Sequence, residues 1–274
     1  MTALPTQPVS ATAYAKINLA LHVRARREDG YHELETIFAF VDVGDAITIE
    51  PADAYELVET GEFAAAMGPV EDNLVTRAAR AACGGVLPPL RIHVDKRLPV
   101  AAGLGGGSAD AGAVLSALGG QDLLALAAPL GADVPACVAS RTMVGRGTGT
   151  DLAPPEVDDV AGLASLLVNP RVPLATGPVF KAWDRIDRGP LPEGSARDIL
   201  IAGRNDLEAP AISLCPLIAD VLAALNETGA LVARMSGSGA TCFAIYDDAS
   251  ACDAAAARIA AQHPDWWQMA GRLR

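Results

Sequence analysis

The sequence predicts a globular protein built from both helices and strands, with enough residues for one large domain or two modest ones. Apolar residues make up 51% of the 274 residues and charged residues 20%, which is typical of a chain that buries a core. Residues 14–24 alternate between two faces, as a strand does. An alanine-rich run after the glycines near position 105 has apolar residues at helical spacing.

The overall charge excludes some classes of partner. The net charge is −12, whereas nucleic acids and anionic membranes bind basic surfaces, so we expect neither as a general partner. The five cysteines form no C-x-x-C pair, which indicates buried thiols in a reducing compartment. Residues 1–10 lack the basic and apolar regions of a secretory signal, and no apolar run is long enough to span a membrane. We therefore expect a cytoplasmic protein.

The first predicted strand, residues 14–24, carries polar residues on one face. Ala15, Ile17 and Leu19 fall on the opposite face, so Lys16 and Asn18 project from the same side of a rigid element. The pattern alone is that of a half-buried strand whose polar face is solvated. The same placement would also serve a binding or catalytic site.

Further elements follow in order. Gly30-Tyr31-His32 leads from a charged turn into a second strand over 36–41. Residues 46–50 and 90–95 alternate as strands, and 73–82 has a helical pattern that Asp72-Asn73 could cap.

The segment from Leu98 to Leu118 is the most informative stretch. Four glycines, at 103, 105, 106 and 107, precede Ser108, which we expect to be the N-cap of a helix with Asp110 in its first turn. Backbone N–H groups converging before a helix form a site for an anion, usually a phosphate. A Walker A loop is excluded because no lysine follows the glycines, and the dinucleotide pattern does not fit. A simple flexible connection is the alternative.

The second half of the chain also has local patterns of helices, strands and loops. Residues 122–130 predict a short helix, and Asp133 before Val134-Pro135 has the pattern of a helix N-cap. Glycine, proline and aspartate in 144–159 indicate a domain junction. A strand over 165–168, a proline-rich loop leading to Phe180, a second glycine loop over 235–240 and an alanine-rich helix over 249–262 complete the prediction.

Four motifs together resemble the GHMP small-molecule kinases. They are A-K-I-N-L from Ala15, D-G-Y-H from Asp29, L-P-V-A-A-G-L-G-G-G-S-A from Leu98, and G-A-D-V-P from Gly131. The resemblance implies an α+β, two-domain GHMP kinase fold, with a ribosomal protein S5 domain 2-like N-terminal domain and an α/β-sandwich C-terminal domain. We expect residues 1–150 to form the N-terminal, ATP-binding domain and residues 151–274 the C-terminal domain.

The resemblance also implies roles for individual residues. Lys16 and Asp133 would be catalytic, with Asp133 as the base. Asn73 and Lys96 would lie near the adenine of ATP, and the nucleotide would further contact Pro99, Val100, Ala101, Ala102, Gly103, Leu104, Gly105, Gly106, Gly107, Ser108 and Ala109. The chain departs from the family pattern at Ala101-Ala102 and at Ala109, so a second hydroxyl contact to phosphate is absent.

The motifs are most similar to family members whose acceptor alcohol carries a cytidine diphosphate. Tyr31 and Phe180 would stack on the two faces of the cytosine ring, His32 would bond its polar edge, and Asn18 and Thr176 would also bind this small-molecule substrate. ATP is the implied phosphoryl donor, with Mg²⁺, whose ligands the sequence does not identify. The alternatives are a kinase with a mevalonate-like or homoserine-like acceptor and a nucleotide-binding sensor without turnover. The sequence leaves the oligomeric state open.

Overall fold

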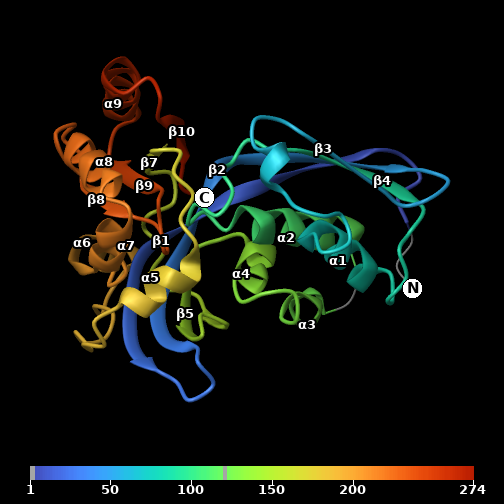
Figure 1. Cartoon of the computed structure of the whole chain (residues 1–274), viewed down its shortest axis with the longest axis horizontal. Helices are drawn as coiled ribbons and strands as arrows, with labels where there is room; N and C mark the ends of the chain where they lie inside the picture. Colours follow the sequence, from blue (N-terminus) through green and yellow to red (C-terminus); the bar gives the residue numbers. More distant parts are fainter. Residues whose placement is uncertain (1–3, 120–121) are drawn as a thin grey trace. The chain divides into compact units, whose positions relative to one another are not determined.

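The computed structural model describes residues 4–119 and 122–274. Residues 1–3, part of the segment in which no secretory signal was expected, lie outside the described residues. The chain folds into two compact units (Figure 1). The first consists of the residues up to Ala15, Val43–Val100 and Gly105–Ser140, and the second of Lys16–Asp42, Ala101–Leu104 and Arg141–Arg274. Neither unit is continuous in sequence, and the linear division at residue 150 stays a prediction.

Two long strands, β1 (Val9–Arg26) and β2 (His32–Pro51), pair with each other and contribute residues to both units. The separate strands predicted over 36–41 and 46–50 are therefore one strand. From Ala15 to Val23 every residue of β1 is buried, so the prediction of a half-buried strand is wrong, and of the two alternatives for its polar face the solvated one is excluded.

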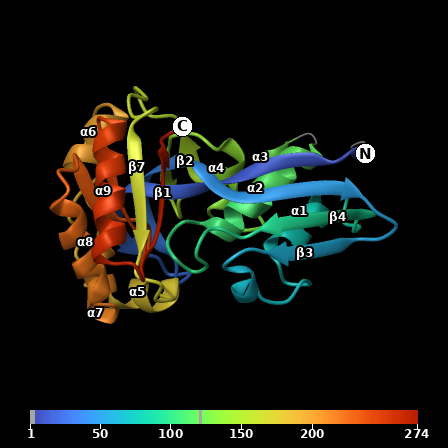
Figure 2. The ribbon, with the colours of Figure 1, turned by 90° about the horizontal axis from the view of Figure 1, so that it is seen from above.

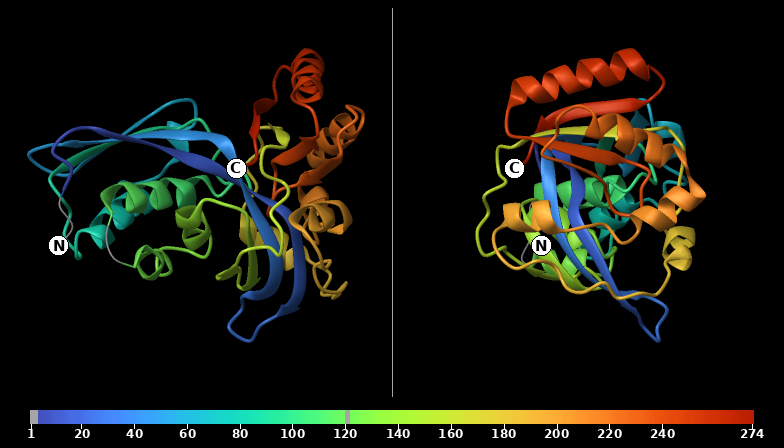
Figure 3. Two further views of the ribbon diagram at one scale, coloured as in Figure 1. Left: turned by 180° about the vertical axis from the view of Figure 1, so that it is seen from behind. Right: turned by 90° about the vertical axis from the view of Figure 1, so that its left-hand side faces the viewer.

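In the first unit, the second half of β2 forms a sheet with β4 (Leu90–Asp95) and β3 (Glu56–Thr60). β2 pairs with β4 in antiparallel register from Ala46↔Asp95 to Pro51↔Leu90, and β3 pairs with β4 in parallel. Figures 1 and 3 show the helices of this unit on one face of the sheet. They are α1 (Leu74–Ala82), α2 (Gly106–Leu118), α3 (Leu123–Ala127) and α4 (Val134–Ala139), and a short 3₁₀ helix, η1, covers Ala64–Ala66.

The second unit contains an antiparallel sheet in the order β10 (Trp267–Arg272), β7 (Ala164–Asn169), β9 (Cys242–Tyr246), β8 (Val232–Met235). Helices α8 (Leu217–Asn226) and α9 (Ala249–Gln262) pack against this sheet (Figure 2). Its other helices are α5 (Thr176–Ala182), α6 (Ala196–Ala202) and α7 (Glu208–Leu214).

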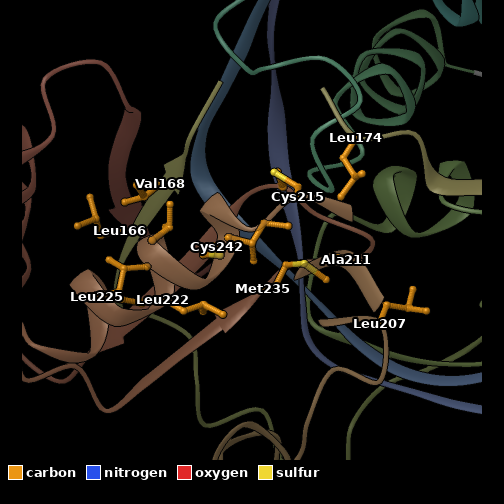
Figure 4. Packing of buried hydrophobic residues seen from close by; sticks show 14 of the residues in the cluster. Leu166, Val168, Leu174, Leu207, Ala211, Cys215, Leu222, Leu225, Met235 and Cys242 are labelled. Carbon is orange, nitrogen blue, oxygen red and sulfur yellow. The ribbon is translucent and has the colours of Figure 1, made fainter. Parts of the chain in front are cut away.

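The core of the second unit lies between the sheet and its helices (Figure 4). Leu166 and Val168 of β7 meet Leu222 and Leu225 of α8, and Met235 and Cys242 come from the neighbouring strands. All five cysteines are free thiols, and all except the half-buried Cys83 are buried, as the sequence predicted.

The first half of β2 also belongs to the second unit, where Leu34–Phe38 pairs with β5 (Met143–Gly147), which in turn pairs with β6 (Asp151–Ala153). Residues 144–159, expected to be a domain junction, thus contain paired strands. Within the described residues, no helix has both the length and the apolar character needed to cross a membrane.

Candidate functional site

The glycine loop leads into α2, as predicted, but the helix begins earlier. Gly105 is the N-cap, with the left-handed backbone angle φ +60°, and Gly106 is the first helical residue. Ser108 therefore lies inside the first turn, and the prediction that it caps α2 is wrong. Asp110 was predicted in the first turn but lies in the second, and its side chain is fully buried. The first N–H groups of α2 lack intrahelical partners, and this is what equips a helix N-terminus to bind an anion.

The middle of the loop, Ala101–Leu104, belongs to the second unit and packs against the second glycine loop. The Ser236 hydroxyl donates to the Gly103 carbonyl at 2.8 Å, and the Thr241 amide donates to the Ala102 carbonyl at 3.1 Å. A Cβ on Gly103 would lie 2.2 Å from the Ser236 carbonyl oxygen, and its φ is +78°. Both facts require glycine, so the two backbones can pack this closely only with glycine at position 103.

Lys16 and Asn18 lie together at the same loop segment of the second unit. The Lys16 amide donates to the Leu104 carbonyl at 3.1 Å, and its Nζ donates to Asn18 Oδ1 at 2.9 Å. Asn18 Nδ2 donates to Thr36 Oγ1 at 2.8 Å, and the Lys16 ammonium lies 5.3 Å from the centre of the Phe38 ring. Each side chain is 3% exposed, so this lysine is held in one orientation inside the protein.

In the second unit, two aromatic side chains contact the ring of His32. The Phe180 ring lies 4.7 Å from the His32 ring, centre to centre, and the Trp183 ring meets it edge-on at 5.7 Å. Burial, and then the charge of Arg26, lowers the pKa of His32 below its usual value, which favours the neutral imidazole. Tyr31 is 65% exposed, so its ring lies mostly in solvent.

Thr176, also in the second unit, begins α5 and shares a hydrogen bond of 3.0 Å with the Ser238 hydroxyl. The second glycine loop is itself held by Asn205, whose amide nitrogen donates to the carbonyls of Met235 and Gly237, both at 2.8 Å. Sequence reasoning missed Asn205 and Trp183 as members of this site. The signal that could have identified Trp183 is its spacing, because it lies three residues after Phe180 in a chain with few aromatic residues.

Asp133 lies in the first unit at the N-cap position of α4, with Pro135 in the first turn as predicted. Its side chain makes no capping hydrogen bond, so capping does not account for a carboxylate at this position. α2 packs against the second half of α4, so closely that a Cβ on Gly112 would lie 2.9 Å from both the carbonyl carbon and Cβ of Cys137.

The two residues expected near adenine are also in the first unit, and both side chains have partners inside the protein. Asn73 caps α1 by accepting a hydrogen bond from the Val75 amide at 2.9 Å, and its Nδ2 donates to Glu59. Lys96 is 1% exposed and pairs with Asp45 and Asp110. The sequence did not identify Asp45, because nothing near it in the chain indicates a distant lysine.

No three His, Cys, Asp or Glu side chains within 4–119 and 122–274 are grouped as ligands for a metal ion.

The candidate residues form two sets, one in each unit. The first unit contributes the two ends of the glycine loop, Asn73, Lys96 and Asp133. The second contributes the middle of the loop with Lys16, Asn18, Tyr31, His32, Thr176 and Phe180.

Comparisons with known proteins all point to one family. The model of the GHMP kinases N terminal domain matches residues 73–141, and that of the GHMP kinases C terminal matches residues 192–265. A protein of Erythrobacter litoralis named 4-diphosphocytidyl-2-C-methyl-D-erythritol kinase is 56% identical over 97% of this chain and 100% of its own length. One of the same name from Novosphingobium aromaticivorans is 57% identical over 96% and 92%.

A solved structure is similar over the same range. The crystal structure of a 4-(cytidine 5'-diphospho)-2C-methyl-D-erythritol kinase superposes with a TM-score of 0.80 at 35% identity. The similarity covers 97% of this chain and 99% of that one.

Proposed function

Because the chain belongs to the GHMP kinases, and within them to the 4-diphosphocytidyl-2-C-methyl-D-erythritol kinase family, we propose that it transfers the γ-phosphoryl group of ATP to the 2-hydroxyl of that alcohol. This reaction belongs to the non-mevalonate route to isoprenoid precursors. The observation that carries the proposal is Lys16, a buried ammonium bonded through its backbone to the glycine loop and through its side chain to Asn18.

Phosphoryl transfer passes through a loose transition state, so alignment and charge stabilisation provide most of the catalysis. In this proposal the N–H groups of the glycine loop bind the phosphates, and the Lys16 ammonium stabilises the charge on the transferring group. The hydrogen bond to Asn18 supports this role, because it fixes the ammonium before substrate binds. Asn18 also binds the acceptor alcohol.

Asp133 acts as the base that orients the acceptor hydroxyl and takes its proton as the new bond forms. Its position supports the role, because the helix α4 that follows it is held against α2 at Gly112. Asn73 and Lys96 lie near the adenine through their backbone positions, since their side chains are engaged elsewhere.

Mg²⁺ accompanies ATP in this proposal. It commonly takes one or two protein carboxylates and leaves its other positions to phosphate and water. This agrees with the described part of the chain, in which no three metal-ligating side chains lie close together. When bound, the ion neutralises phosphate charge. Residues 105–109, at the start of α2, hold the phosphates that carry it.

The cytidine of the substrate is recognised by His32 with Tyr31 and Phe180. A neutral imidazole offers one donor and one acceptor nitrogen, which match the polar edge of cytosine, and the lowered pKa of His32 favours that form. The exposed Tyr31 ring is available to stack on a base. Thr176 binds the same substrate, whereas mevalonate and homoserine have no base for these side chains to recognise. We also propose a cytoplasmic location, where ATP is available.

The test is ADP release with ATP, Mg²⁺ and 4-diphosphocytidyl-2-C-methyl-D-erythritol, compared with mevalonate and homoserine. Of the three acceptors, only the cytidyl alcohol is expected to give turnover. Asp133→Asn should lower kcat by about 10²–10⁴-fold, the usual contribution of a general base. Asp122→Asn is the matched control, because Asp122 also precedes a helix but caps it, and its kcat should stay near that of the wild type.

Each contrary result has a distinct meaning. Turnover with another alcohol would discard the roles of Tyr31, His32 and Phe180 while keeping the kinase. Binding of ATP without ADP release from any alcohol would favour a sensor. Full activity of Asp133→Asn would reject Asp133 as the base.

A further inference from the structure

A buried ion cluster in the first unit joins β2, the end of β4 and α2. Lys96 Nζ lies 2.6 Å from Asp110 Oδ2 and also donates to Asp45 Oδ2. Asp45 and Asp110 are 0% exposed and Lys96 is 1% exposed, so all three ionisable groups are out of water.

The cluster holds the chain on both sides of the glycine loop. Before the loop, Asp45 Oδ1 accepts the amides of Arg97 and Leu98 at 2.6 Å and 2.8 Å. After the loop, Asp110 anchors the second turn of α2 to Lys96, and a Cβ on Gly106 would lie only 3.1 Å from Lys96 Nζ. One ammonium group therefore links the residues that enter the loop to the helix that leaves it.

Stability alone is a poor explanation for this cluster. Two carboxylates share one ammonium, and Asp110 Oδ1 has no hydrogen-bond partner among the described residues. Buried ion pairs are often no more stabilising than apolar side chains of similar size, and an unpaired buried polar atom is unfavourable. Such groups are instead able to fix one geometry, and a loop with four glycines loses much entropy when it becomes ordered.

We propose that Lys96, held between Asp45 and Asp110, is a positioning residue that fixes both ends of the glycine loop and thereby sets its affinity for the phosphates of ATP. The proposal rests on the proposed function, because it takes this loop as the phosphate site. The ammonium acts through the loop and does not contact the nucleotide. Fixing the ends in advance reduces the ordering that ATP binding must otherwise drive.

The experiment compares Asp110→Ala with Asp110→Asn in the full chain. Alanine removes the attachment of α2 to Lys96, whereas asparagine keeps an oxygen that can accept from Nζ. Calorimetry gives Kd for ATP and, separately, Kd for 4-diphosphocytidyl-2-C-methyl-D-erythritol, well below each melting temperature. Ile49→Val, which removes a buried methyl from the same strand as Asp45, controls for general loss of stability.

The expected result for Asp110→Ala is a Kd for ATP about tenfold higher, equivalent to about 1.4 kcal/mol. Its Kd for the alcohol should stay unchanged, and KM for ATP should rise more than kcat falls. Asp110→Asn and Ile49→Val should bind ATP nearly as the wild type does. If Asp110→Ala does not fold, Asp45→Asn takes its place, because it keeps the oxygen for Arg97 and Leu98 but turns an amide toward Lys96.

Three results would overturn the proposal. The first is unchanged ATP affinity in the variant that breaks the attachment. The second is an equal loss in Asp110→Asn, which would assign the effect to charge. The third is a parallel loss for ATP and the alcohol, which would indicate general loosening. ATP binding is measured without an acceptor, so a wrong acceptor in the proposed function would change only the alcohol arm.

Discussion

Replacing Gly112 by alanine tests how its close packing against Cys137 and Val138 positions α4. In an ordinary helix interior this change stabilises a protein by about 1 kcal/mol, because alanine has less backbone freedom to lose. Here the new methyl would lie 2.9 Å from the carbonyl carbon and Cβ of Cys137 and 3.1 Å from the Val138 nitrogen. Two of these three atoms are backbone, so a side-chain rotation cannot relieve the overlap and α4 must move.

The magnitude follows from two opposing effects. Overpacking a filled interior costs about 1–3 kcal/mol, and the gain in helix propensity offsets about 1 kcal/mol of it. We therefore expect a net loss of up to about 2 kcal/mol in the free energy of unfolding. A shift of about 1 Å in Asp133, which precedes α4, would lower kcat by about 10²-fold.

Urea unfolding and steady-state kinetics of the same preparation measure both effects. Gly177→Ala is the control for stability, because Gly177 also lies in a helix but a Cβ there would have nothing within 4 Å. It should be as stable as the wild type or more so. If Gly112→Ala gained stability as the control does and kept its kcat, close packing at this glycine would not be what positions Asp133.

Three further predictions follow. Gly103→Ala should weaken ATP binding and lower the melting temperature, because its Cβ would overlap the Ser236 carbonyl and its φ of +78° is unfavourable for alanine; calorimetry and thermal unfolding measure both, and unchanged values would contradict the close approach. The pKa of His32 lies below its usual value, so KM for the cytidyl alcohol should be constant at neutral pH and rise only below about pH 6.5, as the imidazole gains a proton. In His32→Gln that rise should disappear. Burial raises the pKa of Asp110 to about 7, above the unfolded value, so the folded state binds a proton that the unfolded state has lost. The free energy of unfolding of the wild type should therefore decrease between about pH 4 and about pH 7 relative to that of Asp110→Asn. Urea unfolding measures both values, and the prediction would be refuted if the two changed in parallel with pH over this range.

Elements with a strong local pattern were predicted well from the sequence. The strand 90–95 and the helix 249–262 have the predicted bounds, because an alternating apolar pattern and an alanine-rich run determine them locally. Asn73 caps its helix as predicted, since an asparagine before a helical run supplies the acceptor itself. The start of α2 was misplaced because Gly105 takes a left-handed conformation, which any glycine in the loop could have adopted.

Features that depend on distant residues could not be predicted in this way. The alternation of β1 predicted that Lys16 and Asn18 share a face, but the burial of that face depends on partners such as Thr36. The pairing of Asp45 with Lys96 joins residues 51 positions apart, and neither has a neighbour in sequence that indicates it. The motifs therefore predicted candidate site residues, whose roles stay predictions, but they did not predict what holds those residues in place.

The discontinuous composition of the two units has a consequence for synthesis. Residues 16–42 leave the ribosome before all of 43–140, yet they share a unit with 141–274, which is made last. The apolar residues of β1 and β2 in that segment therefore wait for their partners while the rest of the chain is translated, and contacts between distant segments form slowly. Cutting the gene at codon 150 would divide the second unit between two fragments. We expect the later half alone to aggregate, and folding to be restored only when both halves are produced together.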